Sequence, residues 1–212
     1  MRRHDPARLR GTHTSGPRER IAFPLLQSPP LKTVAFFFAL CATAGSALAA
    51  QVTEVAIANP GFEASGSDKQ NPISGWTLQQ HAGPISYESK IDTRVHAQGK
   101  ASFRITRIQD QIYGSISQKV TIAPATVDRT VELSAQMRTI GVDKRGWVLM
   151  MTVMAPSGND QVRSDPMLGK HEFTRVKVSA KLPAGTRELD IGALLMGGGS
   201  AWLDDVHLRI VQ

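Results

Sequence analysis

Two adjacent acids, Asp204 and Asp205, stand in the largely apolar segment 201–208. Hydrolysis of a glycosidic bond uses two carboxyl groups that flank that bond. The alternation of apolar and polar residues over 200–211 predicts a strand, in which neighbouring side chains point to opposite faces. The two acids therefore cannot flank one bond, and the pair does not predict a hydrolytic site.

The other residues that could do chemistry do not form a recognisable catalytic set. Ser200 follows a run of glycines, but the sequence around it lacks the glycine that completes a nucleophile elbow. The run itself, 197–199, lacks the Lys-Ser/Thr of a phosphate-binding loop. Four histidines beyond residue 50 show no metal-ligand spacing: His81, His96, His171 and His207. We therefore expect a protein that is not an enzyme, and a cryptic glycoside hydrolase remains the second alternative.

The elements that must position these residues are strands. In 131–138 the odd positions are apolar and the even ones polar, and similar period-two patterns recur along residues 50–212. Turn signals rich in Gly, Pro and Asn separate the patterns. The further expected strands are 52–58, 84–92, 101–108, 112–122, 147–154, 172–182, 188–196 and 200–211. About nine or ten strands with such turns predict one all-β sandwich domain over 50–212.

Some positions allow a more specific prediction. The spacing of Tyr87, Ile91 and Val95 would also suit a helix, but we favour a strand through Asp92 followed by a turn. The run 147–154 is apolar on both faces, which is typical of a central strand. Trp147 is in phase with apolar neighbours, and Trp202 shares a face with Val206 and Leu208, so we expect both rings in the core. We expect a third tryptophan, Trp76, to close one end of the sandwich.

The start of the chain has the features of an export signal. Lys32 precedes an apolar run at 34–42, and Ala47-Leu48-Ala49 has small residues where a signal peptidase reads them. We expect 31–49 to be a secretory signal peptide cleaved after Ala49, with a retained membrane anchor as the alternative. Residues 1–30 fit no export class, so we expect a disordered extension or a misassigned start.

Removal of that leader changes the charge and the redox chemistry. The chain has a formal net charge of +7, but residues 50–212 hold 18 basic and 16 acidic residues, so a nucleic-acid partner is not expected. Cys41 lies in the leader and is the only cysteine, so the mature chain would have no thiol chemistry and no disulfide. We expect a secreted or periplasmic protein with no membrane span in its mature chain.

Five short motifs then follow in a recognisable order. They are Asn59-Pro60-Gly61-Phe62-Glu63, Gly75-Trp76, Gly99-Lys100-Ala101-Ser102, Ser117-Gln118 and Ala201-Trp202-Leu203-Asp204-Asp205-Val206-His207-Leu208. This order resembles the carbohydrate-binding modules of bacterial cellulases and xylanases, and is similar to non-catalytic modules that precede secreted peptidases and esterases. The resemblance implies a galactose-binding-like jelly roll.

The resemblance also implies a structural calcium ion that joins the first and last strands. The matching carboxylates are Glu63 and Asp204, and backbone carbonyls from Lys100 to Ser102 would complete the shell. This set suits Ca²⁺, which prefers carboxylate and carbonyl oxygens. The alternative is that both acids only accept hydrogen bonds from the backbone or from arginine.

A sugar-binding surface needs an aromatic ring for stacking and planar polar groups for hydroxyls. Gln136 and Arg138 project from the face opposite Leu133 and Met137, and Gln118 would join them if its strand were adjacent. The remaining candidates are the aromatic platforms Tyr87 and Tyr113. An ordinary solvated sheet face is the alternative for each of these residues.

We therefore expect an exported module that binds a soluble poly- or oligosaccharide, because the row of aromatics typical of binders of crystalline polymers is missing. A secreted hydrolase or an envelope protein is the other expected partner. The first alternative is an interaction or scaffold module with no sugar ligand.

Overall fold

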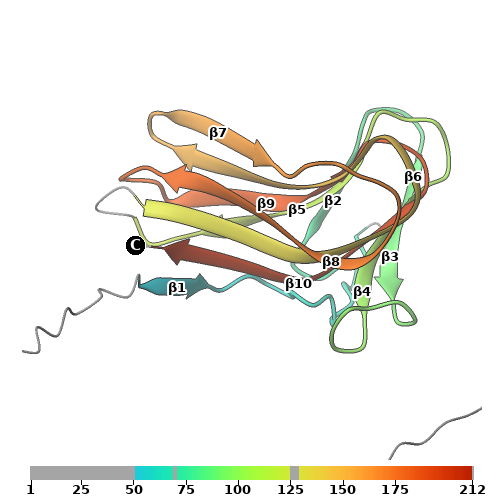
Figure 1. Cartoon of the computed structure of the whole chain (residues 1–212), viewed down its shortest axis with the longest axis horizontal. Helices are drawn as coiled ribbons and strands as arrows, with labels where there is room; N and C mark the ends of the chain where they lie inside the picture. Colours follow the sequence, from blue (N-terminus) through green and yellow to red (C-terminus); the bar gives the residue numbers. More distant parts are fainter. Residues whose placement is uncertain (1–50, 69–70, 125–128, 212) are drawn as a thin grey trace, which may run out of the picture. The chain divides into compact units, whose positions relative to one another are not determined.

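The computed structural model describes residues 51–211 apart from 69–70 and 125–128, and it leaves out the side chain of Lys144 (Figure 1). The extension 1–30, the signal peptide 31–49 and Cys41 lie outside the described residues, so their assignments stay predictions.

The described residues form ten strands and no helix, which confirms the all-β prediction. The strands are β1 (Val52–Val55), β2 (Thr77–Gln80), β3 (Tyr87–Asp92), β4 (Ser102–Arg107), β5 (Gly114–Thr121), β6 (Arg129–Ala155), β7 (Gly158–Arg163), β8 (Met167–Leu182), β9 (Glu188–Leu195) and β10 (Ser200–Val211). All pairings are antiparallel, in the order β2-β5-β9-β6-β10-β4-β3, with β1 beside β10 and both β7 and β8 beside β6.

Strand β6 turns this continuous sheet into two layers. It is 27 residues long; its first part pairs with β10 and β8, and its last part with β9 and β7. Gly141 and Gly146, in the stretch between these parts, have φ of 65° and 79°, a conformation that glycine adopts without strain. One layer therefore holds β8, β10, β1, β4 and β3, and the other holds β7, β9, β5 and β2 (Figure 1).

The core lies between the layers and contains the apolar positions that alternation predicted. Leu133 and Met137 from the first part of β6 and Leu149 and Met151 from its last part are fully buried in one cluster. Trp147 is also fully buried, as predicted, and its Nε1 donates to the carbonyl of Trp202 at 3.2 Å. Burial of these side chains supplies most of the stabilisation of such a fold.

Several local expectations are refined. The strand through Asp92 is confirmed, whereas 131–138 and 147–154 belong to one continuous strand rather than two. The short strands β2 and β7 were not predicted, because Thr77–Gln80 and Gly158–Arg163 are polar and mostly exposed and so have no apolar alternation. Trp76 is buried in the core cluster, and its ring contacts that of Phe62 at a tilt with centroids 5.2 Å apart.

The prediction for Trp202 is wrong in one respect: its ring is buried, but on the outer face of the sheet and outside the core cluster. The register of β10 on β6 shifts between Asp204 and His207, where β10 carries one extra residue, and Asp205 has φ of 49°. This bulge reverses the alternation. Val206 and Leu208 therefore face the core although Trp202 does not.

No helix in the described part of the chain has the length and apolarity needed to cross a membrane.

Candidate functional site

A row of three cations and one tryptophan crosses the outer face of the β3-β4-β10-β6 layer. Lys90 on β3 pairs in register with Arg104 on β4, which pairs with Trp202 on β10, which pairs with Arg138 on β6. These side chains point outward because their neighbours along the strands, among them Phe103, face the core.

The tryptophan ring lies between two guanidinium groups. The Cζ atoms of Arg104 and Arg138 are 5.3 and 5.1 Å from the centroid of Trp202, within the range of cation–π attraction. The indole Nε1 donates to Oδ2 of Asp92 at 2.9 Å. Because the ring is held on both faces and at its nitrogen, its orientation is determined by the fold.

Asp92 is fully engaged in this arrangement. Its Oδ1 accepts from the backbone N–H groups of Arg94 and Val95 at 3.0 and 3.2 Å. Burial alone would raise the pKa of Asp92, but the hydrogen bond from Trp202, the two backbone donors and the charge of Arg104 together hold that pKa below its usual range. Asp92 is therefore an ionised anchor for the tryptophan.

A groove of about 620 Å³ opens beside this stack. Its lining consists of Lys90, Ile91, Asp92, Thr93, Arg94, Val95, Arg104, Ile140, Ser200 and Trp202. Gln136 lies on the same outward face of β6, two residues from Arg138. The groove thus combines the edge of an aromatic ring, 4% exposed, with guanidinium, ammonium and hydroxyl groups that can hydrogen-bond the hydroxyls of a sugar.

The structure brings Gln136 and Arg138 together but places Gln118 elsewhere. Gln118 is on β5, whose neighbours are β2 and β9, so the condition for its joining the other two is not met. Its side chain is 9% exposed, and its amide accepts from the N–H of Ala58 and donates to the carbonyls of Ala58 and Gly75 at 2.8, 3.0 and 2.7 Å. Gln118 therefore holds Ala58 and Gly75 against β5.

Neither tyrosine belongs to the stack or to the lining of the groove. Tyr87 is not an exposed platform: it is 7% exposed, belongs to the core cluster and donates to the carbonyl of Gln111 at 3.1 Å. It is buried because Gly114 leaves room for its ring; a Cβ there would lie 2.4 Å from the ring. Tyr113 is half-buried and makes an edge contact with His81, with ring centroids 5.9 Å apart.

The carboxylates expected to bind calcium do meet in space. Glu63 and Asp204 line one cavity of about 260 Å³ together with Pro60, Gly61, Gln98, Gly99 and Asp205. A Cβ built at Gly61 would lie 3.9 Å from Oε1 of Glu63 and 3.9 Å from Oδ1 of Asp204, so the two oxygens flank the same point. Glu63 also lies against Gly99, where a Cβ would be 1.9 Å from its Oε1.

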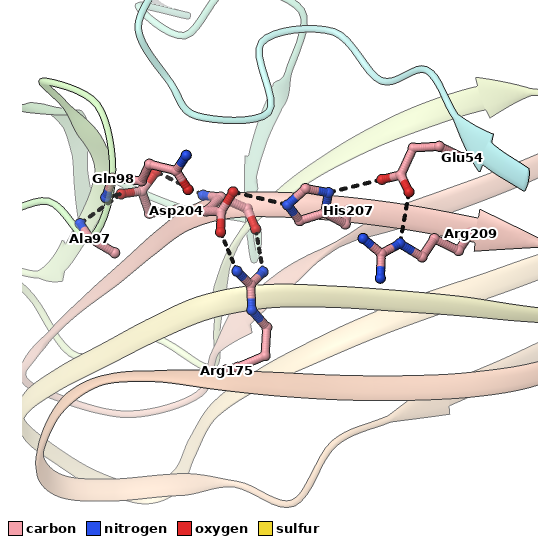
Figure 2. Close-up of polar contacts among 8 residues, drawn as sticks. Glu54, Ala97, Gln98, Arg175, Asp204, His207 and Arg209 are labelled. Atoms are coloured by element: carbon pink, nitrogen blue, oxygen red, sulfur yellow. Dashed lines mark hydrogen bonds and ion pairs between the residues drawn. The ribbon is translucent and has the colours of Figure 1, made fainter. Parts of the chain in front are cut away.

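Asp204 is fully buried, and backbone donors surround it (Figure 2). Its Oδ2 accepts from the N–H groups of Ala97 and Gln98 at 2.7 and 3.0 Å, and its Oδ1 accepts from that of Asp205 at 2.7 Å. Burial raises the pKa of Asp204 despite these donors. A bound cation would offset the cost of keeping this group ionised.

The donor set around that cavity fits a calcium ion in part. Oε1 of Glu63 accepts from the N–H of Lys100 at 2.8 Å, so Lys100 contacts Glu63 as a donor, and Lys100 is not among the residues that line the cavity. Ser102 instead stands opposite Asp92 in the β3–β4 ladder, and its hydroxyl donates to the carbonyl of Val95. Within the described residues no cluster of three or more His, Cys, Asp or Glu could hold a metal, so the remaining oxygens would have to come from the backbone, amides and water.

The second acid of the pair, Asp205, belongs to a different network, with Arg175 and His207. Arg175 on β8 donates to its carbonyl at 2.7 Å and to its Oδ2. Nε2 of His207 is 3.0 Å from Oδ1 of Asp205, and Nδ1 of His207 is 2.8 Å from Glu54, which also accepts from Arg209. The side chains of Asp204 and Asp205 thus accept mainly from different donors, backbone N–H groups for Asp204 and the side chains of Arg175 and His207 for Asp205.

The sequence reasoning did not place Trp202 and Arg104 on the outer face of the sheet. Asp tolerates the positive φ that the bulge needs, but the tandem Asp204-Asp205 does not by itself predict the bulge that moves Trp202 to the outer face. The stacking partner Arg104 depends on β4 lying beside β10, which no local pattern reports.

The sequence matches no family model and no curated protein. Solved structures do match. TmCBM61 in complex with β-1,4-galactotriose aligns with a TM-score of 0.52 at 15% identity over 74% of this chain and 98% of that one. The CBM22-1 xylan-binding domain of Paenibacillus barcinonensis Xyn10C aligns with a TM-score of 0.51 at 16% identity over 72% and 92%.

The chain has the fold of carbohydrate-binding modules. The expected jelly roll is therefore confirmed, and so is the resemblance at the level of fold. A third similar structure is the enzymatically active domain of Bacteriophage CBA120 tailspike protein 4, with a TM-score of 0.56 at 15% identity over 72% of this chain. This chain spans about a fifth of that protein, 21% of its length.

Proposed function

We propose that this protein is an exported, non-catalytic module that binds a carbohydrate chain in the groove beside Trp202. The observation that carries the proposal is the stack of Arg104, Trp202 and Arg138 on the outer face of a fold shared with carbohydrate-binding modules. The stack presents rigid planar donors next to a fixed aromatic edge, and a rigid site loses little entropy when it binds.

The absence of catalysis is part of the same proposal. Asp204 is enclosed by backbone donors, and Asp205 is held by Arg175 and His207, so neither acid is free to protonate a leaving group or to activate water. Release of reducing sugar from any polysaccharide by the purified protein would contradict this part.

The binding proposal is tested by affinity electrophoresis through gels that contain soluble polysaccharides, followed by calorimetry on those that retard the protein. Arg138→Gln should weaken binding about five- to tenfold, since it removes one of the two guanidinium groups that hold Trp202 beside the groove. Gln136→Ala, on the same outward face but outside the groove lining, should weaken binding less. Gln161→Ala, on β7 in the other layer, is the matched control and should bind normally. Unretarded migration in every gel would contradict sugar binding and favour a protein- or envelope-docking module.

We also propose that a calcium ion occupies the cavity between Glu63 and Asp204 and joins the 59–63 motif, the 97–100 loop and β10. The shared cavity and the two converging carboxylate oxygens support it. The ion would supply positive charge to the buried Asp204 and no chemistry beyond that.

Export rests on residues 31–49 and is tested on the secreted protein. Amino-terminal sequencing should find Ala50 as the first residue, and a mature chain that begins at Met1 or Leu31 would contradict it.

A further inference from the structure

The groove beside Trp202 has an unusual balance of charge for a site that binds neutral sugars. Lys90, Arg94 and Arg104 line it, whereas Arg138, which lies over the ring of Trp202, is paired with Glu172 at 3.2 Å. Asp92 is the one carboxylate in the lining of this groove, within the part of the chain that the structure describes.

That carboxylate is already satisfied. Trp202 and two backbone N–H groups occupy the oxygens of Asp92, so it neutralises part of the nearby charge but has little capacity left to accept donors from a ligand. Lys90 pairs with Glu88 at 3.3 Å, but both side chains are about half exposed, and such a pair is weak enough to exchange.

Arg104 is the central feature of the groove. Its guanidinium donates to the hydroxyls of Thr106 and Ser200 at 3.2 and 3.3 Å and lies on the ring of Trp202. No ion pair of Arg104 occurs among the described residues, although the group is half-buried. A guanidinium fixed in this way offers its remaining N–H donors in a fork that matches a carboxylate or a sulfate.

The geometry points to an anionic carbohydrate as the ligand of this groove, a chain that carries carboxylate or sulfate groups. This inference rests on the proposed function and deepens it by naming the class of sugar. The anionic group binds Arg104, with Lys90 and Arg94 adding long-range attraction, and the sugar ring lies toward Trp202 and Arg138.

The test compares polymers that differ only in charge. Calorimetry should show polygalacturonate binding at least about tenfold more tightly than the fully methyl-esterified polymer, because esterification removes the charge and keeps the backbone. Dextran sulfate and dextran form a second matched pair; whichever anionic polymer gains more over its neutral counterpart identifies carboxylate or sulfate as the recognised group. Added salt should reduce the preference in both pairs.

Variants locate the effect. Arg104→Gln should abolish the preference for the charged polymer, Arg104→Lys should retain part of it because it keeps the charge without the fork, and Arg163→Gln on β7 should leave it unchanged. Thermal unfolding of each variant verifies that it is folded.

Three results would overturn the inference. Equal affinity for the charged and esterified polymers would leave the proposed function standing with a neutral ligand. An equal loss in Arg163→Gln and Arg104→Gln would mean general charge attraction rather than this groove. Binding of no polymer, neutral or charged, would remove the proposed function and this inference together.

Discussion

For single side chains, the hydrogen-bond partners show whether a residue has a structural or a binding role. Gln118 carries a planar amide on a strand, the kind of group that often binds sugars. All three of its hydrogen bonds nevertheless go to the backbone of Ala58 and Gly75. The same amide geometry that suits a hydroxyl suits a peptide group equally well. Its role therefore follows from its partners and not from its type.

Replacement of Gln118 by alanine should destabilise the fold without affecting the groove. We expect a loss of about 2–3 kcal/mol in the free energy of unfolding, since buried peptide groups lose their partners. Urea denaturation measures it, and Gln161→Ala on the exposed β7 is the control. If Gln118→Ala lost glycan affinity but kept its stability, Gln118 would be a binding residue and this prediction would be wrong.

Asp205 shows how one residue can set the direction of its neighbours. Its φ of 49° is tolerated by Asp and Asn but is strained for a β-branched residue. We expect Asp205→Val to be less stable than Asp205→Asn by about 1–2 kcal/mol, although both lose the same charge. Equal denaturation midpoints for the two variants would argue against a strained bulge.

At the scale of elements, β1 and β10 are joined by charge as well as by their ladder. Glu54 on β1 contacts His207 and Arg209 on β10 (Figure 2). Partial burial acts to raise the pKa of Glu54, but its contacts with Arg209 and His207 hold that pKa below its usual range. The pKa of Asp205 is also lowered, by its contacts with Arg175 and His207, despite partial burial.

A lowered pKa means that these contacts stabilise the fold above the unfolded-state pKa and are lost as the pH falls through the folded-state value. We therefore expect the melting temperature to fall at about pH 4 and below, and to fall less steeply in Glu54→Gln. The raised pKa of Asp204 has the opposite sign, because its contribution is lost as the pH rises. Asp204 contributes equally to the melting temperatures of wild type and Glu54→Gln, so its contribution cancels when the two pH profiles are subtracted. Identical pH profiles would show that the contacts of Glu54 do not stabilise the fold.

At the scale of the molecule, the proposed calcium ion would connect segments that no strand pairing joins. Glu63 is the last residue of the 59–63 motif, Lys100 and Gln98 lie between β3 and β4, and Asp204 is in β10. A ligand that binds only the folded chain stabilises it in proportion to the logarithm of its concentration.

Calcium at a hundred times its dissociation constant should add about 2–3 kcal/mol of stability, and a chelator should remove it. The melting temperature of Glu63→Gln should no longer respond to calcium, whereas that of the control Glu188→Gln, which pairs with Lys119 on the other layer, should respond as wild type does. A melting temperature that is independent of calcium and chelator would contradict the proposed ion.

The sequence alone determined most of the strands, though not β2 and β7, and most of the core. Alternation is a local property, so the inward positions of Leu133 and Met137 and the burial of Trp147 could be predicted before any strand was placed. It also brought Gln136 and Arg138 to one outward face, and the order of short motifs indicated the jelly roll.

Only the tertiary structure decided which face Trp202 occupies, what Gln118 binds and why Tyr87 is buried. The bulge at Asp205 reverses the alternation within a single strand, and the ring of Tyr87 fits because Gly114 comes from a strand it does not pair with. These outcomes depend on contacts between residues far apart in the chain. A pattern of neighbours cannot encode them, because the free energy that selects them arises only when the two layers pack.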